Sequence, residues 1–506
     1  MSVSSPPAAA PALSTARRAW TVGLMCSAVG LVIAMVTIVN TALPSMAAQT
    51  GASQAQQTWI VDVYTLVLAA LVLPAGALGD RHGRRGVLIT GLVVFAFSCA
   101  APLFTTSAVA LIGARAVTGL GAAMIMPATL SIINASFPPE QRGRAIGIWA
   151  AVAGVGGLGG LVLAGLLLQH FSWHSVFVGP AVLALLMAAG CFTVPTSQER
   201  TPRRFDTAGA ALSALAIGAL VFGILRAADL GWSSWVVLGA IVAGVLLGAA
   251  FAWYEWRQDA PLLDVRLFGN PAFATGAVSV TVQFTAAFGA LFALAQYLQL
   301  VQGYTPLKSG LVLWPIAVSL FPMSMLSAPL ARRFGLRAVT CAALGIIAFG
   351  IVLLGLLGPH SSYLSLAIAV GILGGGFGLS SPAATTGILD NVPPDKYGVA
   401  SAVNDATREI GAALGIALAG SVLTSTYTSS IASATNALPR DVKEIADGSL
   451  AGALAVAERS GPAGGRLAEA ARTAFSDGMW YGLLALAGIV AVGVVVVACI
   501  RRPRRD

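Results

Sequence analysis

Residues 76–85 read Gly-Ala-Leu-Gly-Asp-Arg-His-Gly-Arg-Arg, a short basic stretch between two long apolar runs. A degraded copy, Ala-Pro-Leu-Ala-Arg-Arg-Phe-Gly-Leu-Arg, occupies 328–337, with Gly335 lying 252 positions after Gly83. Glycines permit a tight turn where two helices meet. A basic turn between apolar segments is typical of a membrane protein loop. These stretches therefore indicate a membrane protein built from two related halves.

Two further matches support this internal repeat. They lie 255 positions apart and comprise Gly119, Gly121 and Pro127 with Gly374, Gly376 and Pro382, and then Gly143, Ala164 and Gly165 with Gly398, Ala419 and Gly420. Transporters use such repeats because two similar bundles can move about a site at the middle of the membrane. We therefore predict two six-helix halves in parallel orientation, with two extra helices near 207–254 between them.

The composition of the chain requires lipid as its main solvent. Of its 506 residues 57% are apolar and 10% are charged, whereas soluble proteins carry about 25% charged residues. The net charge of +9 comes from short basic clusters between apolar runs, which is a topology signal and argues against nucleic-acid binding. The five cysteines are scattered singly, so neither a metal site nor a disulfide framework is expected.

Apolar stretches of membrane-spanning length predict an all-α fold with fourteen transmembrane helices. They lie near 19–43, 57–79, 87–104, 108–131, 143–168, 172–194, 207–226, 233–254, 272–298, 308–329, 337–357, 362–385, 398–424 and 476–499. Most of the 29 Lys and Arg residues fall in the alternate loops on the side of the two tails. Both termini are therefore expected in the cytoplasm of the cell, with the protein in the inner membrane.

These spans predict the domain organisation. It comprises a cytoplasmic tail (1–18), a first six-helix bundle (19–194), two extra helices (207–254), a second six-helix bundle (272–499) that contains an outer loop near 425–475, and a basic cytoplasmic tail (500–506). Long loops are exempt from the charge rule, so the basic residues of the outer loop do not contradict this topology. The sequence indicates neither a function for that loop nor an oligomeric state.

The 76–85 motif resembles that of the major facilitator superfamily, and the whole chain is similar to its fourteen-helix drug:proton antiporters, in particular exporters of quaternary ammonium and other lipophilic cations. The stretch 37–44, Thr-Ile-Val-Asn-Thr-Ala-Leu-Pro, is close to the family's first-helix pattern. The resemblance implies that the loop latches the two halves together. Its residues would be Gly76, Gly79, Asp80, Arg81, Gly83, Arg84 and Arg85. The alternative is a basic loop that only sets topology.

Charged residues within apolar spans are the candidates for proton coupling or substrate binding. Arg115 costs about 2.5–3.5 kcal/mol to insert, so it needs a partner, a water-filled cavity or a route to the interface. The resemblance assigns it to proton coupling. Asp62, beside Trp59 and Tyr64, suits a delocalised cation because a carboxylate and aromatic rings both attract one. Alternatively, Asp62 is a solvated outer residue.

Three charges in the thirteenth span form a further candidate site. Asp405 and Glu409 lie four residues apart on one helix face, and Arg408 can neutralise either. An acid in a low-dielectric medium holds protons more tightly, so these acids and Asp62 are the expected proton carriers. A structural ion pair explains the same pattern equally well.

Polar and aromatic side chains in the spans are candidates to line a substrate cavity. They are Asn40, Trp59, Tyr64, Trp149, Gln283, Phe284, Phe288, Gln296 and Trp314. For each aromatic residue the alternative is helix packing or an interfacial belt, and for each polar residue it is a hydrogen bond between helices.

The chain departs from the family pattern at two places. Met35 stands where members often carry an aspartate in the first helix. In the fifth helix, Leu161 replaces the proline of the antiporter motif, whose glycine positions are Gly156, Gly160 and Gly165. The glycines are expected to pack this helix closely against the other half. Without the proline its kink is not expected.

The leading functional prediction is proton-driven export of lipophilic, often cationic drugs by alternating access, without enzymatic activity. No cofactor is expected because the proton gradient supplies the energy, and the sequence lacks the glycine-rich phosphate loop of ATP-driven proteins. The expected partners are small lipophilic or cationic substrates, protons and the lipid bilayer. The alternatives are a dedicated exporter of one antibiotic or metabolite and, more remotely, a membrane sensor or channel.

Overall fold

The structure is a computed structural model that describes residues 14–195, 205–436, 438–460 and 464–500. Within these residues, 13 helices are long and apolar enough to cross a membrane, and the 17-residue apolar helix α6 (Ser175–Cys191) is shorter. Together they correspond to the fourteen predicted spans. Most of the two predicted tails, and Arg200, Arg203 and Arg204 of the basic loop before 207, lie outside the described residues.

The first half is a bundle of six helices. They are α1 (Thr15–Thr50), α2 (Gln54–His82), α3 (Arg84–Ala100, continued by the 3-10 turn η1, Ala101–Phe104), α4 (Ala108–Ser136), α5 (Pro139–His170) and α6. Ser53 begins α2 with a capping box, in which its side chain accepts a hydrogen bond from Gln56 N and the Gln56 side chain reaches back to Ser53 N. Within this half α1 packs on α5, and α4 packs on α2 and α3.

The second half repeats this arrangement. Its elements are α9 (Pro271–Gln296, continued by η3, Tyr297–Val301), α10 (Pro306–Val312), α11 (Trp314–Phe334), α12 (Leu336–Gly355), α13 (Tyr363–Leu389, followed by η4, Pro394–Lys396), α14 (Tyr397–Thr435) and α17 (Gly464–Cys499). The short α10 and α11 together form the span predicted near 308–329. In this half α9 packs on α14, and α13 packs on α11 and α12.

The repeat is visible in individual glycine contacts. A Cβ added to Gly119 would lie 2.6 Å from the carbonyl oxygen of Tyr64, and one added to Gly374 would lie 2.6 Å from that of Ile316, which is 252 positions after Tyr64. The turns that follow α2 and α11 both need a glycine with positive φ, which is 96° at Gly83 and 86° at Gly335. The short sequence matches therefore reflect equivalent helix crossings in the two halves.

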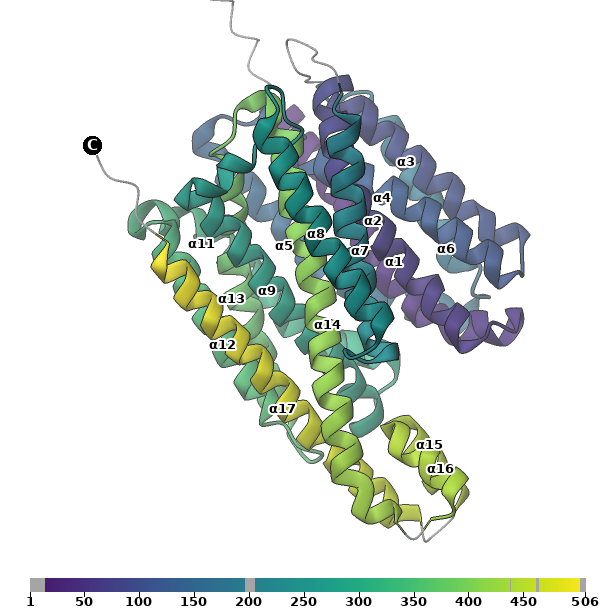
Figure 1. Cartoon of the computed structure of the whole chain (residues 1–506). Helices are drawn as coiled ribbons and strands as arrows, with labels where there is room; N and C mark the ends of the chain where they lie inside the picture. Colours follow the sequence, from purple (N-terminus) through teal and green to yellow (C-terminus); the bar gives the residue numbers. More distant parts are fainter. Residues whose placement is uncertain (1–13, 196–204, 437, 461–463, 501–506) are drawn as a thin grey trace, which may run out of the picture.

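The two extra helices form an antiparallel pair beside one seam between the halves. They are α7 (Thr207–Leu230) and α8 (Trp235–Arg257), joined to α9 through η2 (Val265–Gly269). Helix α7 packs on α2 of the first half and on α14 of the second. Its apolar side chains Val221 and Ile224 contact Ala69 of α2 and α14 residues. Helix α7 therefore spans the α2/α14 seam, and α8 packs on α7 (Figure 1).

The segment near 425–475, predicted as an outer loop, is largely helical. Helix α14 has 39 residues and is therefore about 58 Å long, well beyond a hydrocarbon core of about 30 Å. Leu423, Tyr427 and Ile431 are buried at four-residue spacing, a stripe that continues the helix although its other residues are polar. Figure 1 shows α14 and α17 projecting beyond the bundle with α15 (Arg440–Gly448) and α16 (Leu450–Arg459) against them.

The described ends of the first and last helices lie on the same face of the bundle. Arg18, near the start of α1, donates to Gln141 at the start of α5 at 3.3 Å. The start of α5 also contacts the end of α11, where a Cβ on Gly143 would lie 2.6 Å from that of Ala328. Arg337, three residues after α11, donates to the Ile500 carbonyl at the end of α17 at 3.2 Å. We call this side the terminal face.

Candidate functional site

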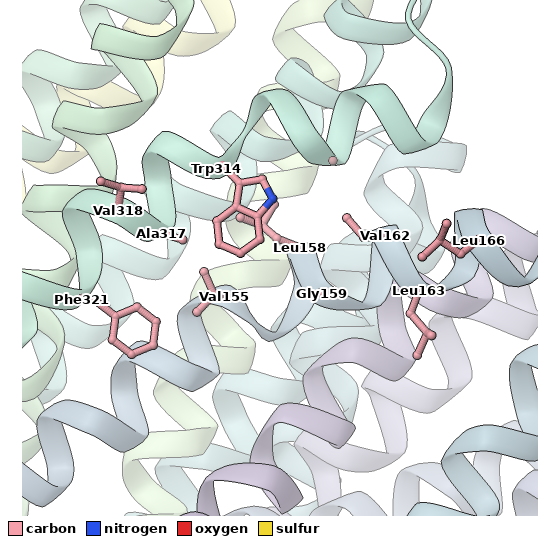
Figure 2. Close-up of a pocket in the computed structure, with 11 residues that line it drawn as sticks. Val155, Leu158, Gly159, Val162, Leu163, Leu166, Trp314, Ala317, Val318 and Phe321 are labelled. Atoms are coloured by element: carbon pink, nitrogen blue, oxygen red, sulfur yellow. The ribbon is translucent and has the colours of Figure 1, made fainter.

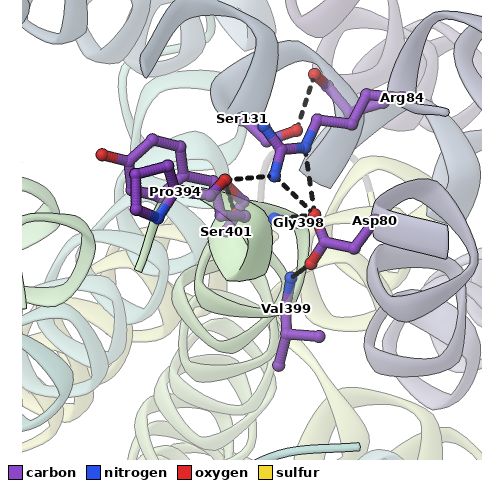
Figure 3. Close-up of polar contacts among 9 residues, drawn as sticks. Asp80, Arg84, Ser131, Pro394, Gly398, Val399 and Ser401 are labelled. Atoms are coloured by element: carbon purple, nitrogen blue, oxygen red, sulfur yellow. Dashed lines mark hydrogen bonds and ion pairs between the residues drawn. The ribbon is translucent and has the colours of Figure 1, made fainter. Parts of the chain in front are cut away.

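A latch between the halves lies at the terminal face, where the end of α2 meets the start of α14 (Figure 3). One oxygen of the Asp80 carboxylate accepts a hydrogen bond from Gly398 N at 2.8 Å, and the other accepts from Val399 N at 2.9 Å. In the first turn of a helix such amides have no partner within the helix itself, and they lie at the positive end of the helix dipole. Asp80 of the first half therefore caps a helix of the second half.

Arg84 completes the latch. Its Nη2 lies 2.7 Å from Asp80 Oδ1 and also donates to the Pro394 carbonyl, on the far side of the seam, at 2.7 Å. The ion-pair partner of Asp80 is therefore Arg84 of the same half. Asp80 lies in the last turn of α2, which ends at His82. The single-residue turn at Gly83 brings Asp80 and Arg84 together.

Two glycines bring the helices of the latch into backbone contact. A Cβ on Gly76 would lie 2.5 Å from the Gly398 carbonyl oxygen, and a Cβ on Gly398 would lie 2.5 Å from that of Gly76. The equivalent crossing in the repeat joins Gly143 to Ala328. There the position equivalent to Asp80 is Arg332. The charged latch is therefore present on one side only of the pseudosymmetric pair.

Two further motif residues, Gly79 and Arg85, have their contacts within the first half. Arg85 Nη1 donates to the carbonyls of Phe192 at 3.4 Å and Val194 at 3.1 Å, just after α6. A Cβ on Gly79 would lie 3.9 Å from Arg84 and would meet no clash. Arg81 is half-buried, and its Nη1 has no hydrogen-bond partner. The geometry thus separates the residues that join the two halves from those that shape the turn.

A buried ion pair lies near the middle of α14. Arg408 Nη1 is 3.5 Å from Asp405 Oδ1, and both side chains are almost fully buried, at 4% and 0% exposed. Asp405 Oδ1 accepts from Asn404 Nδ2 at 3.3 Å, while Asp405 Oδ2 has no hydrogen-bond partner. Arg408 lies 11 residues after Tyr397, so it is about 16 Å along a helix whose membrane portion is about 30 Å long. The pair is therefore at mid-membrane depth.

Aromatic rings from both halves surround the Arg408 guanidinium. It lies 4.7 Å from the ring centre of Phe284 in α9 and 5.4 Å from that of Trp149 in α5. Phe284 in turn packs on Phe288 at 5.8 Å and on Phe377 at 5.1 Å. Four rings and one cation form an aromatic site between the halves. Phe377 was not predicted, because nothing in the sequence separates it from ordinary core residues.

Glu409 connects this charge cluster to the first half. It interacts electrostatically with Arg408 and Asp405 on its own helix and with Tyr64 of α2. The Arg115 guanidinium of α4 lies 4.2 Å from the Tyr64 ring centre, and its Nε donates to the Ile60 carbonyl at 3.1 Å. Because Arg115 is only 1% exposed, the structure excludes the alternative that it extends to an interface. Tyr64 thus lies between the charged residues of the two halves.

Asp62 lies on the face of α2 that meets the extra helix α7. Trp59, on the same face, stacks on Phe222 of α7 with ring centres 6.2 Å apart, and the Arg226 guanidinium lies 4.2 Å from the Trp59 ring centre. Arg226 also pairs with Asp229 at 2.9 Å. The charged groups that act on Asp62 are Arg226 and Asp229. Asp62 is half-buried, so it is not a freely solvated outer residue.

The other candidate cavity residues are dispersed. Gln283 is fully buried with both amide atoms unpartnered, Gln296 is half-buried, and the Asn40 side chain is exposed. Trp314 is separate from the central aromatic residues. It is 57% exposed and, with Leu158 of α5, lines an apolar groove of about 550 Å³ between α5 and α11. Figure 2 shows Val155, Leu158 and Leu163 of α5 on one side of this groove and Trp314, Val318 and Phe321 of α11 on the other.

The glycines of α5 do not all pack as the motif suggested. A Cβ on Gly156 would lie 3.2 Å from the Gly30 carbonyl oxygen of α1, and Gly160 also packs on α1, so both serve contacts within the first half. Of the three motif glycines, Gly156, Gly160 and Gly165, only Gly165 faces the other half, where a Cβ would lie 3.4 Å from Leu307. Helices α1 and α5 are both in the first bundle, and small residues allow their backbones to approach.

Comparison with known proteins assigns the family. Residues 25–416 match the family model described as Major Facilitator Superfamily. The chain belongs to this superfamily. It is 34% identical over 492 residues to a protein named multidrug efflux pump LfrA, from Mycolicibacterium smegmatis, with 95% of this chain and 97% of that protein covered. It is 31% identical over 397 residues to a protein named methyl viologen resistance protein SmvA, from Salmonella typhimurium, with 78% and 80% covered.

The fold is also similar to that of a solved structure. The human organic anion transporter MFSD10 superposes with a TM-score of 0.62 at 14% identity, covering 97% of this chain and 100% of that chain. The chain is therefore a multi-pass membrane protein with the major facilitator fold. The predicted family and fold class are confirmed, whereas the roles of the individual site residues stay predictions.

Proposed function

We propose that the protein exports small lipophilic compounds, many of them cationic, across the cell membrane in exchange for protons. The observation that carries this proposal is the buried Asp405–Arg408 pair, with Glu409 beside it, at mid-membrane depth between aromatic rings of both halves. Charges are costly there and are retained where they serve transport or bind each other. A site shared by two halves is where an alternating-access transporter binds its cargo.

The proposed cargo follows from the chemistry of the site and from the relatives. Trp149 and Phe284 are buried in the state described. When the halves separate, their rings and that of Phe288 would offer faces to flat or delocalised apolar molecules, and the nearby acids would attract positive charge. The printed names of two relatives, a multidrug efflux pump and a methyl viologen resistance protein, support drug-like and cationic substrates for this chain.

Proton exchange would use the acids of α14. Asp405 has one carboxylate oxygen without a hydrogen-bond partner, so it has room for a proton. Protonation of Asp405 would release Arg408 from its ion pair, and Glu409 is the alternative anion for Arg408 on the same helix. A proton entering from outside would thereby change the charge presented to a bound cation and favour its release.

Alternating access would open and close the contacts between the two halves. The latch closes the terminal face, and we propose that this face is cytoplasmic, as the distribution of basic residues predicts. The state described here would then be closed toward the cytoplasm. Opening the latch separates the Asp80 carboxylate from the start of α14 and exposes the central site to the cell interior.

A transport assay with an imposed gradient tests the proposal. Purified protein in liposomes with an acidic lumen should accumulate ethidium, a cationic dye, and accumulation should stop when nigericin collapses the pH difference. The Asp405→Asn, Glu409→Gln double variant should lose the gradient-driven part. The matched control is Glu444→Gln, which removes an exposed carboxylate of α15 whose ion pair with Arg440 spans 3.7 Å. Ethidium movement that is the same with and without the gradient would contradict the proposal.

A panel of unrelated dyes separates the two export hypotheses. Movement of several unrelated lipophilic dyes supports a multidrug exporter. Protection against one compound alone in an expressing strain supports a dedicated exporter.

A further inference from the structure

The outer part of the α2/α7 contact holds a small charged cluster, formed by Asp62, Arg226 and Asp229 beside the Trp59 ring. The Arg226 guanidinium lies 4.2 Å from the Trp59 ring centre and interacts electrostatically with Asp62. A carboxylate beside an aromatic face is the arrangement that binds a delocalised organic cation. Arg226, itself a planar delocalised cation, already fills that arrangement.

We propose that Arg226 is a built-in competitor for cationic substrates and sets the charge that the Asp62–Trp59 site accepts. This inference rests on the proposed export of lipophilic cations and adds to it a specificity-determining residue in the extra helix α7. A cationic substrate reaches Asp62 and Trp59 only when Arg226 withdraws from them. Helix α7 thereby takes part in substrate selection as well as covering the α2/α14 seam.

The contacts of Arg226 indicate how it withdraws. Its Nη1 already bonds Asp229 at 2.9 Å, one helical turn further along α7, while its Nη2 is buried without a hydrogen-bond partner. The Asp229 side chain is 44% exposed, against 12% for Arg226. Movement toward Asp229 therefore keeps the existing ion pair, hydrates the unpaired nitrogen and vacates the position over the ring. When Arg226 withdraws, the only interactions that it loses among those described are those with Trp59 and Asp62.

The charge balance of the cluster indicates which cations fit best. Asp62 and Asp229 supply two negative charges when ionised and Arg226 supplies one positive charge, which leaves one negative charge for a guest. A monovalent cation neutralises this cluster. A divalent cation would leave an excess positive charge, which is costly in a partly buried site. Without the charge of Arg226 the cluster would carry two negative charges and would suit a dication.

Binding measurements on the purified full-length protein in detergent test the inference without relying on transport. The dissociation constants are measured for ethidium (one positive charge), methyl viologen (two positive charges) and Nile red (neutral), for the wild type, Arg226→Gln and Arg226→Lys. We expect Arg226→Gln to bind methyl viologen about tenfold more tightly, ethidium about threefold more tightly and Nile red unchanged. Arg226→Lys keeps the charge and should retain the wild-type preference for ethidium over methyl viologen.

A third variant tests the withdrawal route in the opposite direction. Asp229→Asn removes the alternative partner of Arg226, so Arg226 should remain at Asp62 and both cations should bind about threefold or more weakly. The inference is overturned if Arg226→Gln changes the affinity for all three dyes equally, or leaves the ratio of the two cations unchanged. It is also overturned if no variant binds a cation. A failure of the proposed function, in contrast, would appear as normal dye binding without proton-driven transport.

Discussion

Replacement of Asp80 by asparagine is expected to open the terminal face of the protein. The carboxylate accepts one hydrogen bond through each oxygen from the start of α14, at 2.8 Å and 2.9 Å. Asparagine has one acceptor oxygen and no charge, so one of these bonds is lost and the other is weakened. Because the Asp80–Arg84 pair is formed within the first half, its loss affects the closed and open states more equally than the bonds across the seam.

The magnitude follows from the bonds that cross the seam. A hydrogen bond to a charged group contributes about 1.5–3 kcal/mol, so the closed state should lose about 2–3 kcal/mol relative to the open state. Every 1.4 kcal/mol is a factor of ten, and the shift is therefore about 30- to 150-fold. A 100:1 preference for the closed state would fall to between about 3:1 and 1:1.

Double electron–electron resonance, which measures the distance between two spin labels, can detect this shift. Labels at Glu140, at the start of α5, and Arg332, at the end of α11, report the separation of the halves, because both side chains are exposed and lie near the terminal face. The five native cysteines are replaced by serine or alanine beforehand. We expect Asp80→Asn to add a second, longer distance. Arg85→Gln is the control, since Arg85 bonds only within the first half in the contacts described above. A single unchanged distance in Asp80→Asn would show that the bonds of Asp80 across the seam do not hold the terminal face closed.

Three further variants test other parts of the account. Asp62→Asn should raise the KM for cationic dyes about tenfold and leave neutral dyes unchanged, and equal activity on every dye would remove Asp62 from the site. Arg115→Ala should abolish proton-driven dye uptake into inverted vesicles while the protein still inserts, and intact coupling would disprove its assigned role. Leu161→Pro removes the backbone N–H that bonds the Gly157 carbonyl four residues earlier in α5. Because the Thr37 hydroxyl already donates to this carbonyl, the substitution should lower the free energy of unfolding by only about 1 kcal/mol, whereas an interior proline usually lowers it by ~3 kcal/mol. The control is Leu158→Pro, whose unpaired carbonyl has no such donor among the described residues. Thermal unfolding should show Leu158→Pro to be clearly less stable than Leu161→Pro, and equal losses of stability would contradict this explanation.

The repeat was predictable at the level of single helix crossings. Glycines that match between the halves, such as Gly121 and Gly376, meet equivalent partners, Phe95 and Ile347, which are also 252 positions apart. Glycine is retained at these positions because any larger side chain would separate the backbones. The sequence pattern therefore carried information about contacts between helices, and the fold class followed from it.

The surroundings of Asp62 were not predictable from the sequence. An aspartate in an apolar span signals a functional or paired charge, but its partner depends on which helix covers that face of α2. Arg226, the cation that acts on Asp62, lies inside α7. Its three-residue spacing from Asp229 was the one local signal, since residues at this spacing pair on a helix.

Helix directions also explain the other differences. Trp314 was a candidate cavity residue, yet it faces the groove between α5 and α11 because the break between α10 and α11 at Leu313 changes the face that the following residues present. Gly156 was expected at the seam but packs on α1. Span prediction gives the existence and depth of a helix, whereas its rotation about its own axis is set by tertiary packing.

Exchange of protons for substrate at the acids of α14 can be measured directly as proton release on substrate binding. Purified protein in weakly buffered detergent solution is mixed with ethidium, and a pH indicator dye records the protons released. Exchange of a proton for a cation at the acids of α14 predicts release by the wild type and a much smaller signal from the Asp405→Asn, Glu409→Gln variant. Saturable ethidium binding with no proton release from the wild type, or with the same release from the variant, would contradict the account.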